Sequence, residues 1–398
     1  MALIVPILVA HTGAQATDAA LDRAKRLLKE QPIIDGHNDY PWAVREKGKS
    51  DLDAFDMRKP QPQLMTDFAR LHAGGVGGQF WSVYVPVELQ GQAAVTATLE
   101  QIDIVHRMVA KYPDTLALAL TADDVVRIQK AGKIASLIGM EGGHSIDNSL
   151  GTLRMMYRLG ARYMTITHTL NTPWADSATD TPKNHGVNAF GEDVFREMNR
   201  LGMLIDLSHV SPDTMLAALR VSTAPVIFSH SCAKALTNVP RDVPDDVLAL
   251  LPKNGGVIMA TFVPGFVSQE VADYNAREDA ERARLKITLG TDDAVSKQIE
   301  DVWRKANPRP RATIKHVADH IDHLRKVAGI DHVGLGGDFD GITAVVQGLE
   351  DTSKYPDLIA ELIRRGYSDS DIKKIAGENI LRVLRGAETE ARRLASAR

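Results

Sequence analysis

Short apolar runs alternate with longer amphipathic stretches along most of this chain. The runs are rich in β-branched residues, as buried parallel strands are, and the stretches between them follow the helical period, for example over residues 101–112 and 191–201. Eight runs predict strands, over residues 33–39, 79–86, 134–141, 163–168, 203–209, 225–230, 256–263 and 332–338. Eight strands separated by helices predict an α/β fold, a single (β/α)8 barrel of the TIM type.

Two segments depart from the strand–helix repeat. Residues 265–329 are too long for a plain crossover and carry many charges, which predicts a helical insertion before the last strand. Residues 355–388 have the period of two amphipathic helices separated near Gly366, and we expect these C-terminal helices to cover the barrel. Since no linker or repeat divides the chain, residues 17–398 are expected to form one domain.

The first residues form a separate segment. Residues 2–10 are apolar, and Ala14-Gln15-Ala16 resembles a signal-peptidase site, but the usual basic flank is missing. Residues 1–16 are therefore either a signal-like segment or a disordered tail. The first alternative implies a periplasmic or secreted protein, and the second a cytoplasmic one. No other stretch approaches the roughly 18 apolar residues of a membrane span, so stable membrane insertion is not expected.

Charge and cysteine content narrow the classes of partner. With 47 basic and 51 acidic residues the formal net charge is -4, which gives no general attraction for nucleic acid. Cys232 is the only cysteine, so an intrachain disulfide is excluded. A small, diffusing substrate fits this composition better than a macromolecule.

Metal-type side chains stand where the predicted strands end, which is where barrels carry function. His37 and Asp39 follow the first run and share one face, so they could bind one ion together. Glu141 ends the third run before two glycines, and a carboxylate can bridge two cations. Each signal has a structural alternative, since His-x-Asp is common by chance and a strand-end glutamate often bonds a loop.

The fifth and sixth runs both end in Ser-His, at Ser208-His209 and Ser229-His230. Either histidine alone could be a buried structural residue. Two imidazoles at the ends of consecutive strands instead favour the ligands of a second metal ion.

Two further residues suit acid–base and electrostatic roles. Asp338 follows a run of glycines and could move a proton between water and a leaving amine, whereas Asp340 is expected to be structural. His168 ends the fourth run and could polarise a substrate carbonyl, although it could also hold the loop at residues 171–174.

Together these residues resemble the renal-type membrane dipeptidase family, zinc dipeptidases of the amidohydrolase superfamily. Supporting stretches lie at residues 35–39, 78–84, 171–174, 238–246 and 336–341. The resemblance implies two zinc ions per chain, bridged by Glu141 and a hydroxide. It assigns His37 and Asp39 to one ion, and His209 and His230 to the other.

The resemblance also implies the roles of three residues toward substrate. Asp338 would shuttle the proton, His168 would stabilise the oxyanion, and Arg241 would bind the terminal carboxylate and so restrict substrates to dipeptides. It further suggests a homodimer and tolerance of a C-terminal D-residue. The loop at residues 261–266 is expected to help line the side-chain pocket.

The sequence departs from the mammalian members, which are disulfide-bonded and lipid-anchored. Val87 and Leu170 stand where a cysteine pair would be sought, and no anchor signal follows Arg398. The resemblance is therefore to a soluble member of bacterial type.

Other functions remain open at this point. A two-metal barrel could equally be a lactonase, a β-lactam hydrolase or a phosphoester hydrolase, and Arg241 discriminates because it demands a free carboxylate. A metal-stabilised binding protein would lack a ligand or the proton shuttle, and none is missing. No Gly-x-Ser-x-Gly motif supports covalent catalysis.

Overall fold

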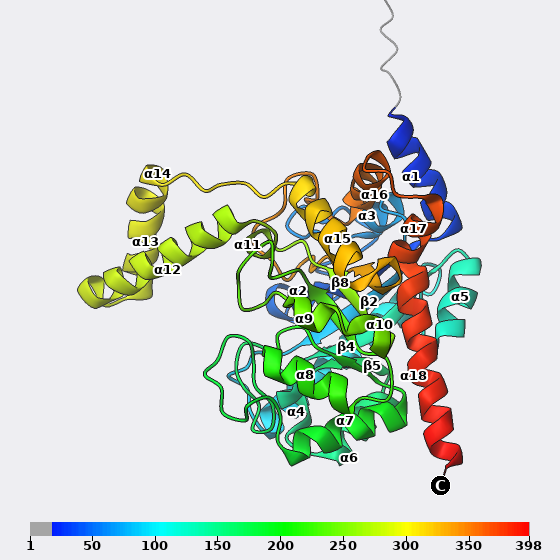
Figure 1. Cartoon of the computed structure of the whole chain (residues 1–398). Coiled ribbons are helices and arrows are strands. Elements are labelled where there is room, and N and C mark those ends of the chain that lie inside the picture. Colours follow the sequence, from blue (N-terminus) through cyan, green and yellow to red (C-terminus); the bar gives the residue numbers. More distant parts are fainter. Residues whose placement is uncertain (1–17, 398) are drawn as a thin grey trace, which may run out of the picture.

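Eight parallel strands close into a barrel in the computed structural model, which describes residues 18–397 (Figure 1). The signal-like segment predicted at residues 1–16 lies outside the described residues. Neighbouring strands follow the order β2–β1–β9–β8–β7–β6–β5–β4, and β2 pairs with β4 to complete the ring. The predicted (β/α)8 barrel is confirmed. Its strands are β1 Ile33–Asn38, β2 Val76–Tyr84, β4 Ile134–Glu141, β5 Ala161–Thr165, β6 Leu204–Asp206, β7 Ile227–Ser231, β8 Val257–Ala260 and β9 Val333–Leu335.

A ninth strand, β3 (Leu116–Leu118), was not among the predicted runs. It pairs with the first residues of β4, on the edge that β5 takes over from Ile138 onward. Three residues without a β-branched side chain give no strand pattern, which is why the sequence did not predict it.

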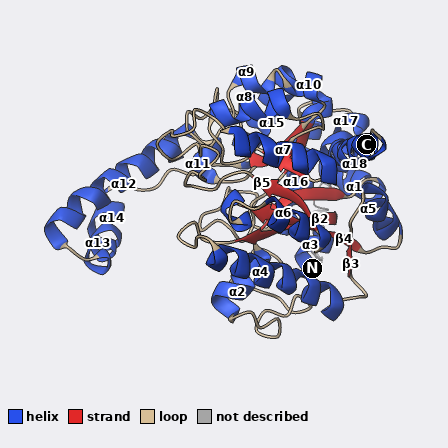
Figure 2. Cartoon of the chain, turned by 90° about the horizontal axis from the view of Figure 1, so that it is seen from below, coloured by secondary structure: helices blue, strands red, loops and turns tan. Residues whose placement is uncertain are grey.

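Helices surround the barrel and follow the strands in the expected alternation (Figure 2). The predicted helix at residues 191–201 corresponds to α7, whereas the one at 101–112 is only the second half of α4. The helices preceding the arm are α1 Ala19–Glu30, α2 Tyr40–Gly48, α3 Phe68–Ala73, α4 Gln92–Lys111, α5 Ala122–Lys130, α6 Leu150–Arg158, α7 Ala189–Leu201, α8 Pro212–Val221, α9 Asp245–Leu248, α10 Leu251–Asn254 and α11 Pro264–Val267. Within residues 18–397, no helix combines the length and the apolar character needed to cross a bilayer.

A helical arm projects from the barrel between β8 and β9 (Figures 1 and 2). It comprises α12 (Gln269–Leu289), α13 (Asp292–Gln298) and α14 (Arg304–Ala306), with a π-helical turn before α14. The predicted insertion extended to residue 329, but α15 (Ile314–Ala328) contacts β8 and β9 and serves as the ordinary crossover helix. The prediction placed the end of the insertion too late because both segments are helical and charged.

The C-terminal helices pack on the barrel as predicted. They are α16 (Tyr355–Arg364), α17 (Asp369–Lys373) and α18 (Asn379–Ser396). The break falls at Gly366, whose φ of 89° is a left-handed conformation that glycine adopts without strain. α18 contacts α7 and α5 and lies along the outside of the barrel.

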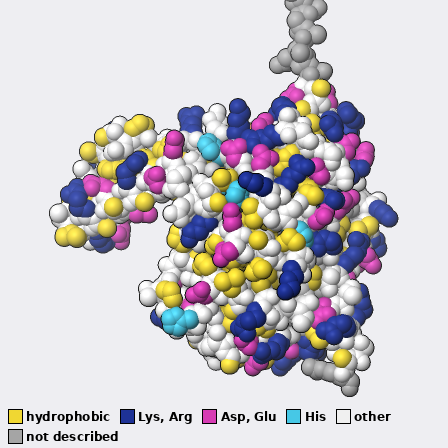
Figure 3. Space-filling model, viewed as in Figure 1, with side chains coloured by type: hydrophobic (Ala, Val, Ile, Leu, Met, Phe, Trp, Pro, Cys, Tyr) yellow, Lys and Arg dark blue, Asp and Glu magenta, His cyan; other side chains and the backbone are white. Residues whose placement is uncertain are grey.

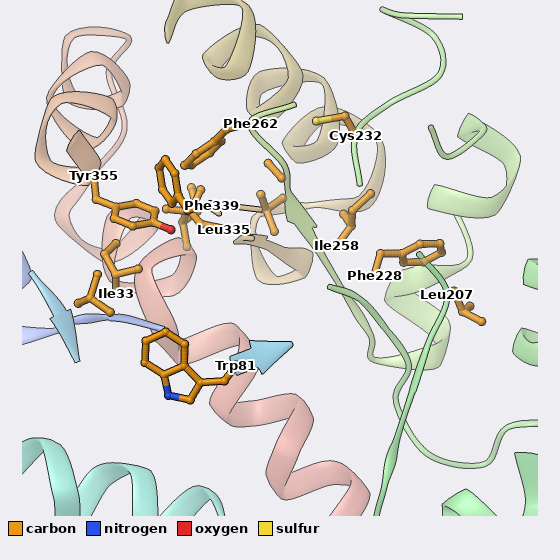
Figure 4. Packing of buried hydrophobic residues seen from close by; sticks show 14 of the residues in the cluster. Ile33, Trp81, Leu207, Phe228, Cys232, Ile258, Phe262, Leu335, Phe339 and Tyr355 are labelled. Atoms are coloured by element: carbon orange, nitrogen blue, oxygen red, sulfur yellow. The ribbon is translucent and has the colours of Figure 1, made fainter. Parts of the chain in front are cut away.

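An aromatic cluster supports the turn that follows β9 (Figure 4). The fully buried rings of Phe262, Phe339 and Tyr355 lie with their centroids 5.7–5.8 Å apart. Buried aromatic rings at this spacing contribute through both burial and edge-to-face contact. The backbone next to Asp338 is therefore held in place by packing.

Candidate metal centre and active site

A cavity of about 460 Å³ opens at the carboxyl ends of the barrel strands. The structure brings all eight predicted site residues to this end, and seven of them line the cavity directly. These seven are Asp39, Glu141, His168, His209, His230, Arg241 and Asp338, and the eighth, His37, lies buried beside them. Parallel strands collect at one end side chains that are far apart in sequence.

Glu141 occupies the centre of the cluster. Its Oε2 lies 3.4 Å from His37 Nε2, whereas its Oε1 lies 3.1 Å from His209 Nε2 and 3.5 Å from His230 Nε2. The hydroxyl of Ser82 donates to Oε2 at 3.1 Å. The two carboxylate oxygens thus face different imidazoles, as a carboxylate shared by two cations would.

His37 and Asp39 lie on one side of Glu141. His37 Nε2 is 3.2 Å from Asp39 Oδ2, and Asp39 Oδ1 is buried without a hydrogen-bond partner among the described residues. Tyr163 contacts the other ring nitrogen, Nδ1, at 2.9 Å, and its hydroxyl donates to the carbonyl of Gly36. Because the hydroxyl proton of Tyr163 is donated to Gly36, the hydroxyl oxygen accepts from Nδ1–H of His37. Nε2 of His37 then faces the carboxylates.

Electrostatics at His37 favour a positive charge at this position. Burial by itself would lower the pKa of His37, but Tyr163, Glu141 and Asp39 together raise that pKa well above its ordinary value. In the same way, burial opposes ionisation of Glu141, yet His37 and His209 bring the pKa of Glu141 well below its ordinary value. The pocket between the ring and the carboxylates is thus suited to a cation.

His209 and His230 lie on the other side of Glu141, with their Nε2 atoms 2.9 Å apart. Burial lowers the pKa of both rings well below the ordinary value, with further contributions from Arg241 at His209 and from His37 at His230. Both imidazoles are therefore neutral at pH 7, the form in which histidine binds metal.

His209 and His230 are not at equivalent strand positions, although the paired Ser-His ends suggested it. His230 lies within β7, whereas β6 ends at Asp206, three residues before His209. The carboxylate of Asp206 accepts the N–H of Ser208 at 3.1 Å, which turns the chain out of the strand.

Three residues of the cluster have left-handed backbone conformations. The φ angles are 71° at His209, 60° at Asp338 and 67° at Asp340. This conformation is uncommon for residues other than glycine, although Asp and His adopt it more often than most, and such backbone outliers concentrate at functional sites. Asp340, which was expected to be structural, accepts the N–H of Met65 at 2.6 Å and also lines the cavity.

His168 and Arg241 lie on the wall of the cavity. The His168 ring is between Tyr84 and His209, with centroids at 5.0 and 4.2 Å, and burial lowers its pKa, so the ring is neutral. Arg241 is 6% exposed, and its Nη2 donates to the carbonyl of His230 at 3.4 Å. Its Nη1 has no partner among the described residues, and Phe266 stacks under the guanidinium at 5.2 Å. A buried guanidinium with a free donor suits an anionic ligand.

Asp338 lies close to His37, Asp39 and Glu141. Only 15% of its side chain is exposed, and Oδ1 lies 4.0 Å from His37 Nε2. Burial raises the pKa of Asp338 well above its ordinary value; the charge of His37 opposes the shift, and the carboxylates of Asp39 and Glu141 add to it. A raised pKa makes this carboxyl group a candidate for carrying a proton.

Several supporting residues were not predicted from the sequence. Tyr163 contacts the ring of His37, and Asp206 accepts the backbone N–H of Ser208, next to His209. Trp42 and Tyr84 line the cavity. Asp206 carried the only available signal, as a lone charge inside the apolar run Leu204-Ile205-Asp206-Leu207. Val263 and Phe266 line the cavity, as expected for the loop after β8.

Comparisons with known proteins identify the family to which this sequence is similar. A sequence model of the family described as membrane dipeptidase (peptidase family M19) matches residues 21–398. Dipeptidase verJ of Clonostachys rogersoniana is 41% identical over 383 residues, which cover 93% of this chain and 88% of that protein.

Solved structures share the fold. The crystal structure of the probable dipeptidase PvdM from Pseudomonas aeruginosa matches with a TM-score of 0.81 and 25% identity, over 93% of this chain and 99% of that one. A metallopeptidase from Rhodobacter sphaeroides, liganded with a phosphinate mimic of the dipeptide L-Ala-D-Ala, matches with a TM-score of 0.74 and 23% identity, over 90% of this chain and 99% of that one.

Proposed function

Because the chain belongs to the membrane dipeptidase family, peptidase family M19, we propose that it is a binuclear zinc dipeptidase formed by one catalytic domain, residues 17–398. The observation that carries this proposal is the convergence of ligand-type side chains on Glu141 beside the buried Arg241. Metallo-dipeptidase chemistry is a property of the family. The metal, its number and the substrate range are our proposals.

The residues present fit two zinc ions. His37 and Asp39 would hold one ion, His209 and His230 the other, and Glu141 would bridge them. Imidazole and carboxylate are ligands that zinc prefers, and Nε2 of His37 and Oδ1 of Asp39 are buried without hydrogen-bond partners among the described residues. When bound, the ions supply Lewis-acid activation of a water molecule and of the scissile carbonyl.

Asp338 and His168 carry the acid–base and electrostatic parts of the reaction. Asp338 takes a proton from the attacking water and returns it to the leaving amine, which its raised pKa supports. His168 is neutral and partly exposed to the cavity, so a ring N–H can donate to the developing oxyanion.

Arg241 sets the length of the substrate. Arg241 lines the cavity, its Nη1 is buried without a hydrogen-bond partner among the described residues, and the guanidinium would bind the terminal carboxylate of a dipeptide. A longer peptide would place an amide there instead and leave the guanidinium unpaired. The dipeptide mimic bound by the Rhodobacter sphaeroides metallopeptidase supports a dipeptide substrate, including one with a C-terminal D-residue.

Zinc analysis and a dipeptide assay test this function. We expect two zinc ions per chain, hydrolysis of L-Ala-D-Ala and L-Ala-L-Ala but not of tripeptides, and loss of activity on chelation that added zinc restores. Metal content is measured by elemental analysis and hydrolysis by amine release. If zinc binds and no dipeptide is cleaved, the dipeptidase assignment is wrong, and lactones, β-lactams and phosphoesters become the substrates to assay.

We also propose that the chain forms a homodimer through one face of α12. Ile287 is 87% exposed and shares a helix face with the exposed Ala276, Ala280 and Ala283, opposite the face that packs inside the arm. Figure 3 shows apolar side chains along the arm, away from the barrel.

Charge supports a second copy as the partner on this face. The first half of α12 carries mostly acidic residues and the second half mostly basic ones. If two copies pack antiparallel about Ala280, the helical repeat places Asp273 of each copy on the same flank as Arg284 of the other. One helix pair buries less than the roughly 800 Å² per partner of a standard interface, so the dimer should depend on concentration.

Sedimentation velocity over a concentration series tests the dimer. Ile287→Glu should convert dimer to monomer with unchanged hydrolysis, because the side chain is exposed and far from the cavity, whereas Met155→Glu, on the surface helix α6, should leave the dimer intact. Arg284→Asp should weaken the dimer, and adding Asp273→Arg should restore it. A monomer at all concentrations, or no effect of Ile287→Glu, contradicts this interface.

A further inference from the structure

Asp206 is a buried carboxylate behind the metal centre, outside the cavity lining. It is fully buried at the end of β6 and accepts four hydrogen bonds. Oδ1 accepts the N–H groups of Ser208 at 3.1 Å and Ser229 at 2.8 Å. Oδ2 accepts the hydroxyl groups of Thr165 at 2.5 Å and Ser229 at 2.6 Å. The carboxylate therefore ties together three neighbouring strands, β5, β6 and β7.

Ser229 links this carboxylate to His230. Its Oγ lies 2.6 Å from Asp206 Oδ2 and 2.8 Å from His230 Nδ1. A hydroxyl has a single proton, and the carboxylate can only accept, so that proton is committed to Asp206. Ser208 Oγ, the alternative acceptor, is neutral and more distant, at 3.5 Å.

The direction of these hydrogen bonds determines the tautomer of His230. Because the Ser229 hydroxyl donates to Asp206, its oxygen must accept from Nδ1–H of the imidazole. The proton of the neutral ring is then on Nδ1, and Nε2 presents its lone pair toward Glu141, 3.5 Å away. Partners behind a metal-binding histidine act in this way on its orientation and basicity.

We propose that Asp206 is a positioning residue that acts through Ser229 to hold His230 in the Nδ1–H tautomer, with Nε2 available to metal. This inference rests on the proposed zinc site. The Nδ1 proton of His37 is held by different partners, since Nδ1–H donates to Tyr163, whose hydroxyl donates to the backbone carbonyl of Gly36. The two sides of the centre therefore depend on separate hydrogen-bond chains.

Asp206 could only connect the strands, or it could also fix the tautomer of His230. The variant Asp206→Asn distinguishes these two roles. The amide keeps the size of the side chain and one acceptor oxygen for the two backbone N–H groups. Its NH₂ replaces Oδ2 and donates to Ser229, whose proton turns toward His230 Nδ1. His230 then carries its proton on Nε2, which points into the metal centre and cannot bind.

Zinc titration against a competing chelator tests the proposal, with the wild-type chain as reference. We expect wild type to bind two ions and Asp206→Asn to bind the second ion about 10- to 100-fold more weakly. Nitrogen NMR of the metal-free protein should show His230 changing from the Nδ1–H to the Nε2–H form. If wild type itself binds no zinc, the proposed function fails; if wild type binds two ions and Asp206→Asn binds them equally well, only this inference fails.

Two further variants serve as controls. Thr165→Val removes one hydrogen bond to the same carboxylate without changing Ser229, and this variant should keep both ions. Equal metal loss in Thr165→Val and Asp206→Asn would mean that Asp206 only connects the strands, and it would overturn the proposal. Ser229→Ala removes the link alone, so His230 should show a mixture of tautomers even if Asp206→Asn does not fold. A pure Nδ1–H form in Ser229→Ala also overturns the proposal.

Discussion

Asp338→Asn lowers kcat for dipeptide hydrolysis by about 10²- to 10⁴-fold, the usual contribution of a positioned acid–base group, with zinc content and KM close to wild type. The reason is that an amide of the same size can neither accept a proton from water nor return one to the amine. The measurement is steady-state hydrolysis of L-Ala-D-Ala at fixed zinc, with elemental analysis of the purified variant. Asp338 is chosen because its pKa is raised and because it lies beside His37 and Glu141.

Asp340→Asn is the matched control for Asp338→Asn. The same chemical change is made two residues away, on a carboxylate that also has a left-handed backbone but accepts a hydrogen bond from Met65. Asp340→Asn should lower the stability of the protein, measured as a lower melting temperature. It should reduce kcat much less than Asp338→Asn does. Equal loss of kcat in the two variants, or loss of zinc from Asp338→Asn, contradicts the role of Asp338 in proton transfer.

Arg241→Ala lowers kcat/KM for dipeptides by roughly 30- to 4,000-fold. The estimate follows from the roughly 2–5 kcal/mol lost when one partner of a buried, hydrogen-bonded charge pair is truncated, at 1.4 kcal/mol for each factor of ten. The guanidinium is buried and held by Phe266 and the carbonyl of His230, so its free donor is already placed for a carboxylate. Hydrolysis of L-Ala-D-Ala by variant and wild type measures the loss.

A dipeptide amide isolates the contact between Arg241 and the substrate carboxylate. Wild type should cleave the amide about as poorly as Arg241→Ala cleaves the acid, and the variant should no longer distinguish the two substrates. Arg220→Ala, an exposed arginine on α8, should leave the preference unchanged. If Arg241→Ala still prefers the free acid as strongly as wild type does, the carboxylate is bound elsewhere.

The barrel could be predicted because each of its strands overlaps an apolar run of six to eight residues, even where, as in β6 and β9, the strand itself has only three. β2 and β4, with nine and eight residues, give strong patterns. β3 has three residues, none of them β-branched, and gives no such pattern, and the edge it occupies on β4 is set by pairing across the sheet. The end of the arm was misplaced for a related reason, because only packing against β8 and β9 distinguishes α15 from the projecting helices.

The candidate site was predictable where a polar residue stands at or near the end of a predicted strand. His37, Glu141 and His230 have that position, and the meeting of strand ends in a barrel then brings them together. Tyr163 and Asp206 lie within apolar runs instead, and their partners belong to strands distant in sequence. Which interior residue supports which ligand is decided by closure of the barrel, and local pattern carries no information about it.

The left-handed backbone at His209, Asp338 and Asp340 has a consequence for redesign of this chain. Glycine fits those three positions with the least strain, so a procedure that ranks residues by backbone compatibility alone would choose it there. The resulting protein would lose the imidazole of His209, the proposed metal ligand, the carboxylate of Asp338, the proposed proton carrier, and the hydrogen bond between Asp340 and Met65. Stabilising libraries should therefore hold these positions constant and draw their substitutions from the outer helices.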